Sequence, residues 1–223
     1  MEMTKHHPVE EQLTAFAAGS LPLSQALCIS AHLEHCTHCQ QKLQRLNQVG
    51  SELMQQLKPA PASTALKSRL LDQLDKLGLE STEQDTAQHN STIPRCLQQF
   101  IKDDYSSLDW KRVSSDIQSI ELCRDSNGAR VELLKIRPGG SATTHTHLGD
   151  EYTVILEGSF PDEAGLYHQG DFLVQTAQHH HTPVATLDRD CICLAVTEGP
   201  IQFTGWLARL FNPFIRRSYA WPQ

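Results

Sequence analysis

The chain has 223 residues, of which 39% are hydrophobic and 20% charged, a composition typical of globular proteins and sufficient for two modest domains. It contains no run of about 18 apolar residues that would span a bilayer, and its N-terminus lacks the apolar stretch of a secretory signal. These features predict a cytoplasmic protein. The formal net charge of −7 argues against direct binding to nucleic acid, which usually requires a basic face.

The first part of the chain shows helical periodicity. Apolar residues recur every three or four positions, and Gly or Pro residues end the runs. Thr37 and Gln40 fit the capping box of a third helix, and Ser63 or Thr64 is placed to cap a fourth. The pattern predicts about four helices, over residues 9–18, 23–35, 37–58 and 65–78. They form a small helical domain at residues 1–79, followed by a polar linker at residues 80–94.

The remainder of the chain has a different texture. Short runs rich in β-forming residues are separated by Gly, Pro and Asp, as in ARVELLKIRP, EYTVILEG, DFLVQTA and DCICLAVT. This spacing predicts an all-β barrel or sandwich over residues 95–200, so the whole chain is a multidomain α + β protein. Residues 201–223 form a tail in which Trp206, Leu207, Leu210 and Phe211 predict a short amphipathic helix, which suits packing on the barrel better than a membrane surface or partner.

The stretch HLEHCTHC, residues 32–39, combines histidines and cysteines at metal-ligand spacing. His32 and Cys36 are four apart and share a helix face, and Cys39 follows at the start of the next helix. His35 and His38 fall between these positions and should point elsewhere. A structural zinc site needs four ligands. The pair His6-His7, just before the first helix, is the source of the fourth, and zinc would add folding energy to a small core.

A second group of candidate ligands lies in the β-rich part. Gly139, the pair His145 and His147, then Glu151 and Gly158 have the spacing of the first cupin motif. Two imidazoles and a carboxylate suit a divalent transition metal. A looser match to the second cupin motif runs from Gly170 to His181, which is its candidate metal ligand. His179 is the alternative ligand. The usual proline, second glycine and asparagine of this motif are replaced by Thr176, Gln178 and Ala185, which weakens any inference to a particular cupin enzyme.

Cys191 and Cys193 are two apart in a predicted strand and so share a face. They are interpreted either as buried packing residues or as redox-active thiols that line the barrel near the metal. The ligand types do not decide the cupin metal, for which zinc, iron and manganese are all candidates.

The two halves together resemble the ChrR-type zinc anti-sigma factors of bacteria. The resemblance rests on an N-terminal histidine, the H-x3-C-x2-C motif about 25 residues later, two further helices and a single cupin, and it covers nearly the whole chain. It implies zinc in both domains. The implied ligands are His7, with His6 in reserve, and His32, Cys36 and Cys39 in the first site, and His145, His147, Glu151 and His181 in the second.

The resemblance also implies a function and a partner. Members of this family hold a sigma factor of the extracytoplasmic-function group inactive, in a complex expected to be 1:1, and release it on stress from singlet oxygen or organic hydroperoxides. The fourth helix would insert with the others between two regions of the sigma factor, although a fourth place in the bundle is the plainer interpretation. The chain is then not an enzyme. Two alternatives remain: a small cupin dioxygenase or isomerase with a structural zinc bundle, and a cupin sensor of a small molecule.

Overall fold

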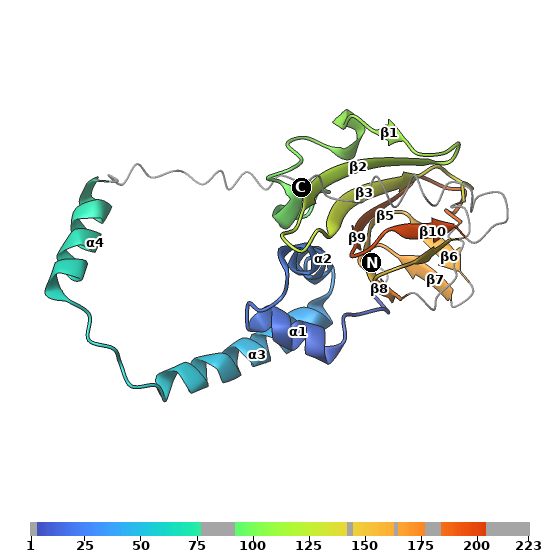
Figure 1. The fold of residues 1–223 in the computed structure, drawn as a ribbon. Helices are drawn as coiled ribbons and strands as arrows, with labels where there is room; N and C mark the ends of the chain where they lie inside the picture. Colours follow the sequence, from blue (N-terminus) through green and yellow to red (C-terminus); the bar gives the residue numbers. More distant parts are fainter. Residues whose placement is uncertain (1–3, 77–91, 142–144, 163–164, 177–183, 204–223) are drawn as a thin grey trace.

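The computed structural model describes residues 4–76, 92–141, 145–162, 165–176 and 184–203. Four helices come first, and an antiparallel β-domain follows, as the sequence predicts (Figure 1). Within the described residues no helix is long and apolar enough to cross a membrane. The helices are α1 (Glu10–Ala17), α2 (Leu23–Leu33), α3 (Thr37–Gln55) and α4 (Thr64–Lys76).

The β-domain is built around one antiparallel sheet of six strands in the order β1-β2-β3-β9-β5-β8. Two small sheets, β10-β4 and β6-β7, complete it. Two short 3-10 turns, η1 (Arg95–Leu97) and η2 (Tyr105–Ser107), precede the strands. The strands are β1 (Lys111–Arg112), β2 (Ile117–Arg124), β3 (Arg130–Ile136), β4 (His145–His147), β5 (Glu151–Glu157), β6 (Ser159–Asp162), β7 (Gly165–His168), β8 (Phe172–Gln175), β9 (Cys191–Thr197) and β10 (Ile201–Phe203).

The six-stranded sheet is apolar on both faces. Along β5, the side chains of Tyr152, Val154 and Leu156 face α2, whereas Ile155 belongs to a second cluster on the opposite face with Cys191 and Cys193 of β9. This is the alternation that strand geometry imposes. Because each face is covered, β5 is buried from Glu151 to Leu156, and its apolar residues Val154, Ile155 and Leu156 follow one another without polar alternation.

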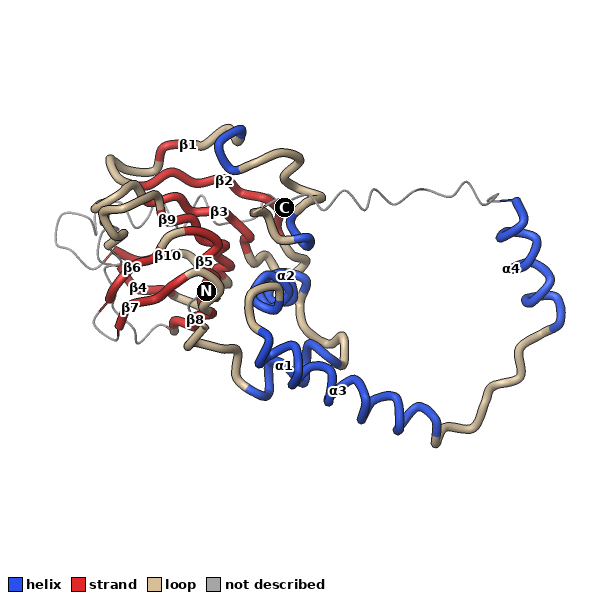
Figure 2. Tube along the Cα trace, turned by 180° about the vertical axis from the view of Figure 1, so that it is seen from behind, coloured by secondary structure: helices blue, strands red, loops and turns tan. Residues whose placement is uncertain are grey.

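The helices and the sheet share one hydrophobic core. Leu27, Cys28 and Ala31 of α2 pack in the same cluster as Val154 of β5 and Leu194 of β9. Figures 1 and 2 show α2 against the sheet, with α1 and α3 beyond it. The two predicted domains are therefore joined through their cores, a feature that the local sequence pattern does not reveal.

Helix α4 stands apart from this assembly in both views (Figures 1 and 2). The described side chains of α4 are exposed along the helix. This arrangement supports the interpretation of α4 as an arm and not as a fourth member of the bundle. The Pro59-Ala60-Pro61 break before it explains the separation, because proline cannot continue the preceding helix.

Two details differ from the sequence prediction. The N-cap of α3 is Cys36 and not Thr37, and the sulfur of Cys36 accepts the backbone N–H of Cys39 at 3.4 Å. The β-domain also extends beyond residue 200, because β10 pairs with β4, and Ile93, placed in the linker, is 3% exposed and belongs to the core. The predicted tail helix lies outside the described residues.

Candidate metal centre

Four side chains from three parts of the helical region meet at the corner between α2 and α3. His32 lies in the last turn of α2, Cys36 is the N-cap of α3, and Cys39 lies in the first turn of that helix. His7 reaches them from the segment before α1. Their candidate ligand atoms all lie within 4.8 Å of one another, so the structure brings together the four residues that the sequence pattern and the resemblance single out.

Local geometry accounts for this convergence. Because α2 ends at Leu33, His32 and Cys36 do not share one helix face as predicted. The turn after α2 and the extended N-cap at Cys36 instead bring Cys36 and Cys39 to the same corner as His32. The Nδ1 atom of His7 lies 3.3 Å from the sulfur of Cys36 and 3.5 Å from that of Cys39. These separations are close to those between ligands that share one tetrahedral zinc ion.

The hydrogen bonding of His32 tests whether the residues fit a metal. Its Nδ1 donates to the backbone carbonyl of Gly170 at 2.6 Å. Its Nε2 is buried and has no hydrogen-bond partner among the described residues. A buried nitrogen without a partner is costly, and metal-ligating histidines commonly donate their other ring N–H to a backbone carbonyl. The site therefore fits a metal ion bound at Nε2 of His32.

Burial also sets the protonation of these ligands. Desolvation lowers the pKa of His32 to about 4, and desolvation with the nearby His38 lowers the pKa of His7. Both imidazoles are thus neutral near pH 7, as metal ligation requires. Burial and the neighbouring Cys36 raise the pKa of Cys39 to about 12. This thiol holds its proton until a positive charge arrives to stabilise the thiolate.

The other nearby histidines lie outside this cluster. His6, the reserve ligand of the sequence analysis, packs its ring on Tyr167 with centroids 4.6 Å apart. His35 is half-buried and lies beside Gly170, and His38 is exposed with its ring 5.2 Å from that of His7. The choice of His7 over His6 thus agrees with the geometry.

The cupin ligands are described only in part. Glu151 begins β5 and is 7% exposed, and it accepts a hydrogen bond from the hydroxyl of Thr153 at 3.0 Å. His145 and His147 lie in β4, which pairs with β10, and the structure describes only their backbone. His181 and its alternative His179 lie outside the described residues. The second metal site therefore remains a prediction.

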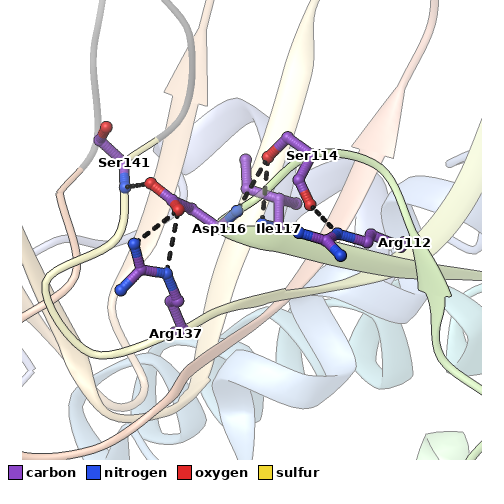
Figure 3. Close-up of polar contacts among 6 residues, drawn as sticks. All are labelled: Arg112, Ser114, Asp116, Ile117, Arg137 and Ser141. Atoms are coloured by element: carbon purple, nitrogen blue, oxygen red, sulfur yellow. Dashed lines mark hydrogen bonds and ion pairs between the residues drawn. The ribbon is translucent and has the colours of Figure 1, made fainter.

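The backbone does bring the two cupin motifs side by side. Ser141, just before the first motif's histidines, forms an isolated bridge with Val184, just after those of the second. Asp116 holds Ser141 in place beside this bridge. Its carboxylate accepts the N–H of Ser141 at 3.2 Å and pairs with Arg137 (Figure 3). Arg137 and its neighbours line a hollow of about 300 Å³. Of the charged groups around this hollow, Asp116 and Arg137 pair with each other, and Arg112 donates to the carbonyl of Ser114 at 3.0 Å. These contacts are typical of a structural network.

The barrel interior holds residues to which the motifs assign no role. The sulfurs of Cys191 and Cys193 are buried and 3.7 Å apart, so the predicted shared face is confirmed. Glu132 of β3 alternates with Val131 and Leu133, which face the helices, and it therefore faces the interior. Burial raises the pKa of Glu132 to about 7. The only sequence signal for this inward-facing glutamate is its position among apolar residues in the run VELL.

Comparison with known proteins identifies the family. A family model described as the ChrR cupin-like domain matches residues 98–202. The chain is 31% identical to the anti-sigma-E factor ChrR of Cereibacter sphaeroides over 213 residues, which cover 95% of this chain and 98% of that protein.

A solved structure supports the same assignment. The crystal structure of Rhodobacter sphaeroides SigE in complex with the anti-sigma ChrR matches with a TM-score of 0.76 and 29% identity. The match covers 87% of this chain and 100% of the other. The chain therefore belongs to the ChrR family of anti-sigma factors.

Proposed function

We propose that this protein is a cytoplasmic anti-sigma factor. It binds a sigma factor of the extracytoplasmic-function group in a 1:1 complex and releases it under oxidative stress from singlet oxygen or organic hydroperoxides. The observation that carries the proposal is the similarity over nearly the whole chain to ChrR, whose solved structure is a complex with SigE. Because the similarity includes both halves of the chain, we assign inhibition of the sigma factor to the helices and reception of the signal to the cupin.

The exposed apolar surface of the helices supports a protein partner. Large hydrophobic side chains line the second half of α3 and one face of α4 at helical spacing. Most are about half exposed or more, an unfavourable state for so many neighbouring apolar groups. An amphipathic helix with such a stripe is suited to a groove on another protein. The stripe consists of Val49, Leu53 and Met54 on α3, Leu57 just after that helix, and Leu66, Leu70, Leu71 and Leu74 on α4.

Zinc at the first site would fix the angle between α2 and α3. We assign His7, His32, Cys36 and Cys39 as its ligands because two thiolates and two imidazoles match a structural zinc site. The bonds between zinc and its ligands add folding free energy that a larger hydrophobic core would otherwise supply. With the corner fixed, α3 carries its apolar stripe away from the sheet and toward a partner, and α4 continues that surface.

We assign the cupin as the receiver of the oxidative signal, with a divalent metal held by His145, His147, Glu151 and His181. The burial of Glu151 and the bridge between Ser141 and Val184 support a site at this end of the barrel. Zinc is the family expectation, and iron or manganese suits the same ligands. We propose residues 1–79 as the helical domain and residues 80–92 as the linker. Because Ile93 packs in the core and β10 pairs with β4, we extend the cupin to residues 93–203.

The enzyme alternative is disfavoured. A catalytic cupin does not need a helical domain with an exposed apolar arm, whereas an anti-sigma factor does. The family assignment over the full chain points the same way. A cupin that binds a small signalling molecule shares this architecture and differs only in the trigger.

Variants of α4 test the binding surface. The protein is mixed with its cognate extracytoplasmic-function sigma factor, each purified separately, and the affinity of the complex is measured by calorimetry. The double variant Leu70→Asp, Leu74→Asp should weaken binding at least 100-fold because it places charges in the apolar contact. Ser68→Asp, on the opposite side of α4, should bind as the wild type does. Equal affinities for all three proteins would overturn the assignment of α4.

A further inference from the structure

Three consecutive residues of the cupin, Gly170, Asp171 and Phe172, contact the two histidines of the helical metal site or the segment that carries them. Gly170 accepts the His32 Nδ1–H at 2.6 Å. The N–H of Phe172 donates to the carbonyl of His6 at 3.0 Å. The segment 170–172 thus reaches across the domain interface to both sides of the cluster.

Asp171 makes the densest set of these contacts. It is 1% exposed. Its Oδ1 accepts the backbone N–H groups of Lys5 at 2.7 Å and His6 at 3.1 Å, and its Oδ2 accepts the N–H of His168 at 2.9 Å. Hydrogen bonds to an ionised acceptor are stronger than neutral ones. The carboxylate therefore fastens the N-terminal segment to the cupin one residue before His7.

Gly170 fits its place closely. Its φ of +90° is a backbone angle that residues with a side chain rarely adopt. A Cβ atom at this position would lie 2.6 Å from the Cβ of His35 and 2.7 Å from Cγ2 of Thr4. The backbone of the cupin thus approaches both α2 and the N-terminal segment at the point where Gly170 meets His32. Segment 170–172 leads directly into β8, whose last residue, Gln175, pairs with Glu151.

We propose that Asp171 is a positioning residue of the helical metal site: by holding residues 5 and 6, it places His7 against Cys36 and Cys39 and so raises the affinity of the site for its metal. The cupin then contributes to the metal site without supplying a ligand. This inference rests on the proposed metal site. It predicts that loss of the Asp171 contacts weakens metal binding while the four ligands stay in the chain.

Lys5 offers a matched pair of variants that leaves the cupin unchanged. Lys5→Pro removes the backbone N–H that donates to Asp171, whereas Lys5→Ala removes the side chain and keeps that donor. Asp171→Ala removes all three contacts from the other side. Asp171→Asn keeps one acceptor oxygen and should fall between Asp171→Ala and the wild type.

The probe is Co²⁺, titrated into the metal-free full-length protein in competition with a chelator. Thiolate-to-cobalt absorption reports only the cysteine-containing site. Lys5→Pro and Asp171→Ala should each weaken Co²⁺ binding about 10-fold, the range in which loss of an outer-shell partner acts. Lys5→Ala should match the wild type. Thermal unfolding of each metal-free variant shows whether Asp171→Ala still folds. If Asp171→Ala does not fold, the comparison of Lys5→Pro with Lys5→Ala decides whether the Asp171 contact affects metal affinity.

The outcomes separate this inference from the proposed function. Suppose that the wild type shows the thiolate-to-cobalt band and that Cys36→Ser lacks it, so that the metal site exists. If Co²⁺ then binds Lys5→Pro as tightly as it binds Lys5→Ala, Asp171 has no positioning role. If the wild type gives no thiolate band, the metal site itself is wrong, and the inference fails with it.

Discussion

His32, a helical residue, donates from Nδ1 to the carbonyl oxygen of Gly170, a cupin residue, at 2.6 Å. This hydrogen bond selects the tautomer that leaves Nε2 available, and it joins the candidate zinc ligand to the sheet. The helical region and the cupin therefore meet at the candidate metal site. A change in the cupin has a short physical route to the corner from which α3 extends.

The first prediction concerns the helical metal site. Cys36→Ser or His32→Ala should lower the zinc content of the purified protein by one equivalent, because a structural site needs all four ligands. The melting temperature should fall as well, since metal bonding contributes to folding. Elemental analysis measures the zinc. His38→Ala, which removes a neighbouring exposed histidine, should keep the full content, and a loss of zinc in this control would contradict the ligand assignment.

A second prediction addresses the cupin. His147→Ala should remove the other metal equivalent and leave the thiolate band of the first site intact. Metal analysis of this variant beside His32→Ala tests both sites. The two-site account fails if the metal content is unchanged in both variants.

The third prediction is a pH dependence that originates at Glu132. Its pKa of about 7 in the folded protein lies above its ordinary value near 4.5. The folded state thus binds the proton more tightly than the unfolded state, and stability declines as the pH rises from about 4.5 to 7. Glu132→Gln should remove this decline and stabilise the protein at pH 8 by on the order of 1 kcal/mol. Denaturant unfolding at several pH values measures it.

The control for Glu132 lies directly across the strand pair. Glu121 faces Glu132 in the register of β2 and β3, and the pairing with Arg124 lowers its pKa. Glu121→Gln should therefore leave the stability at pH 8 unchanged or slightly lower it. A gain of equal size in both variants would show that the effect does not come from the burial of Glu132.

A fourth prediction concerns the joint between helices and sheet. Asp125, in the turn after β2, accepts both the N–H and the hydroxyl of Ser24 at the start of α2, each at 2.9 Å. Asp125→Ala should lower the free energy of unfolding by about 1–3 kcal/mol because it leaves buried donors without a partner. Urea titration measures the change. Asp188→Ala, an exposed carboxylate, should cost less than 0.5 kcal/mol, about what surface changes usually cost.

Much of this architecture follows from local sequence signals. Helical spacing predicts α1 to α4, because this pattern acts within a few residues. The strand runs predict β3, β5, β8 and β9 for the same reason. The predicted shared helix face of His32 and Cys36 is wrong, since α2 ends at Leu33 and Cys36 is the extended N-cap of α3. The choice between His6 and His7 needed a resemblance, since neighbouring histidines in an irregular segment carry no periodicity.

The contacts that join the two halves could not be predicted in this way. Gly170 is 138 residues from His32, and no local rule relates a glycine in a β-turn to a distant imidazole. Leu27 and Cys28 read as bundle residues, yet they pack on the sheet. The role of Asp171 depends on the same tertiary contact. Such features follow from the packing of whole elements and not from the pattern within any one of them.

The most direct test of the central claim is transcription in vitro. RNA polymerase core enzyme and the cognate extracytoplasmic-function sigma factor transcribe a target promoter while the full-length, zinc-loaded protein is titrated. The account predicts that transcription falls to background at one equivalent of this protein per sigma factor and recovers on exposure to singlet oxygen or an organic hydroperoxide. Undiminished transcription at a tenfold excess of the protein would contradict it.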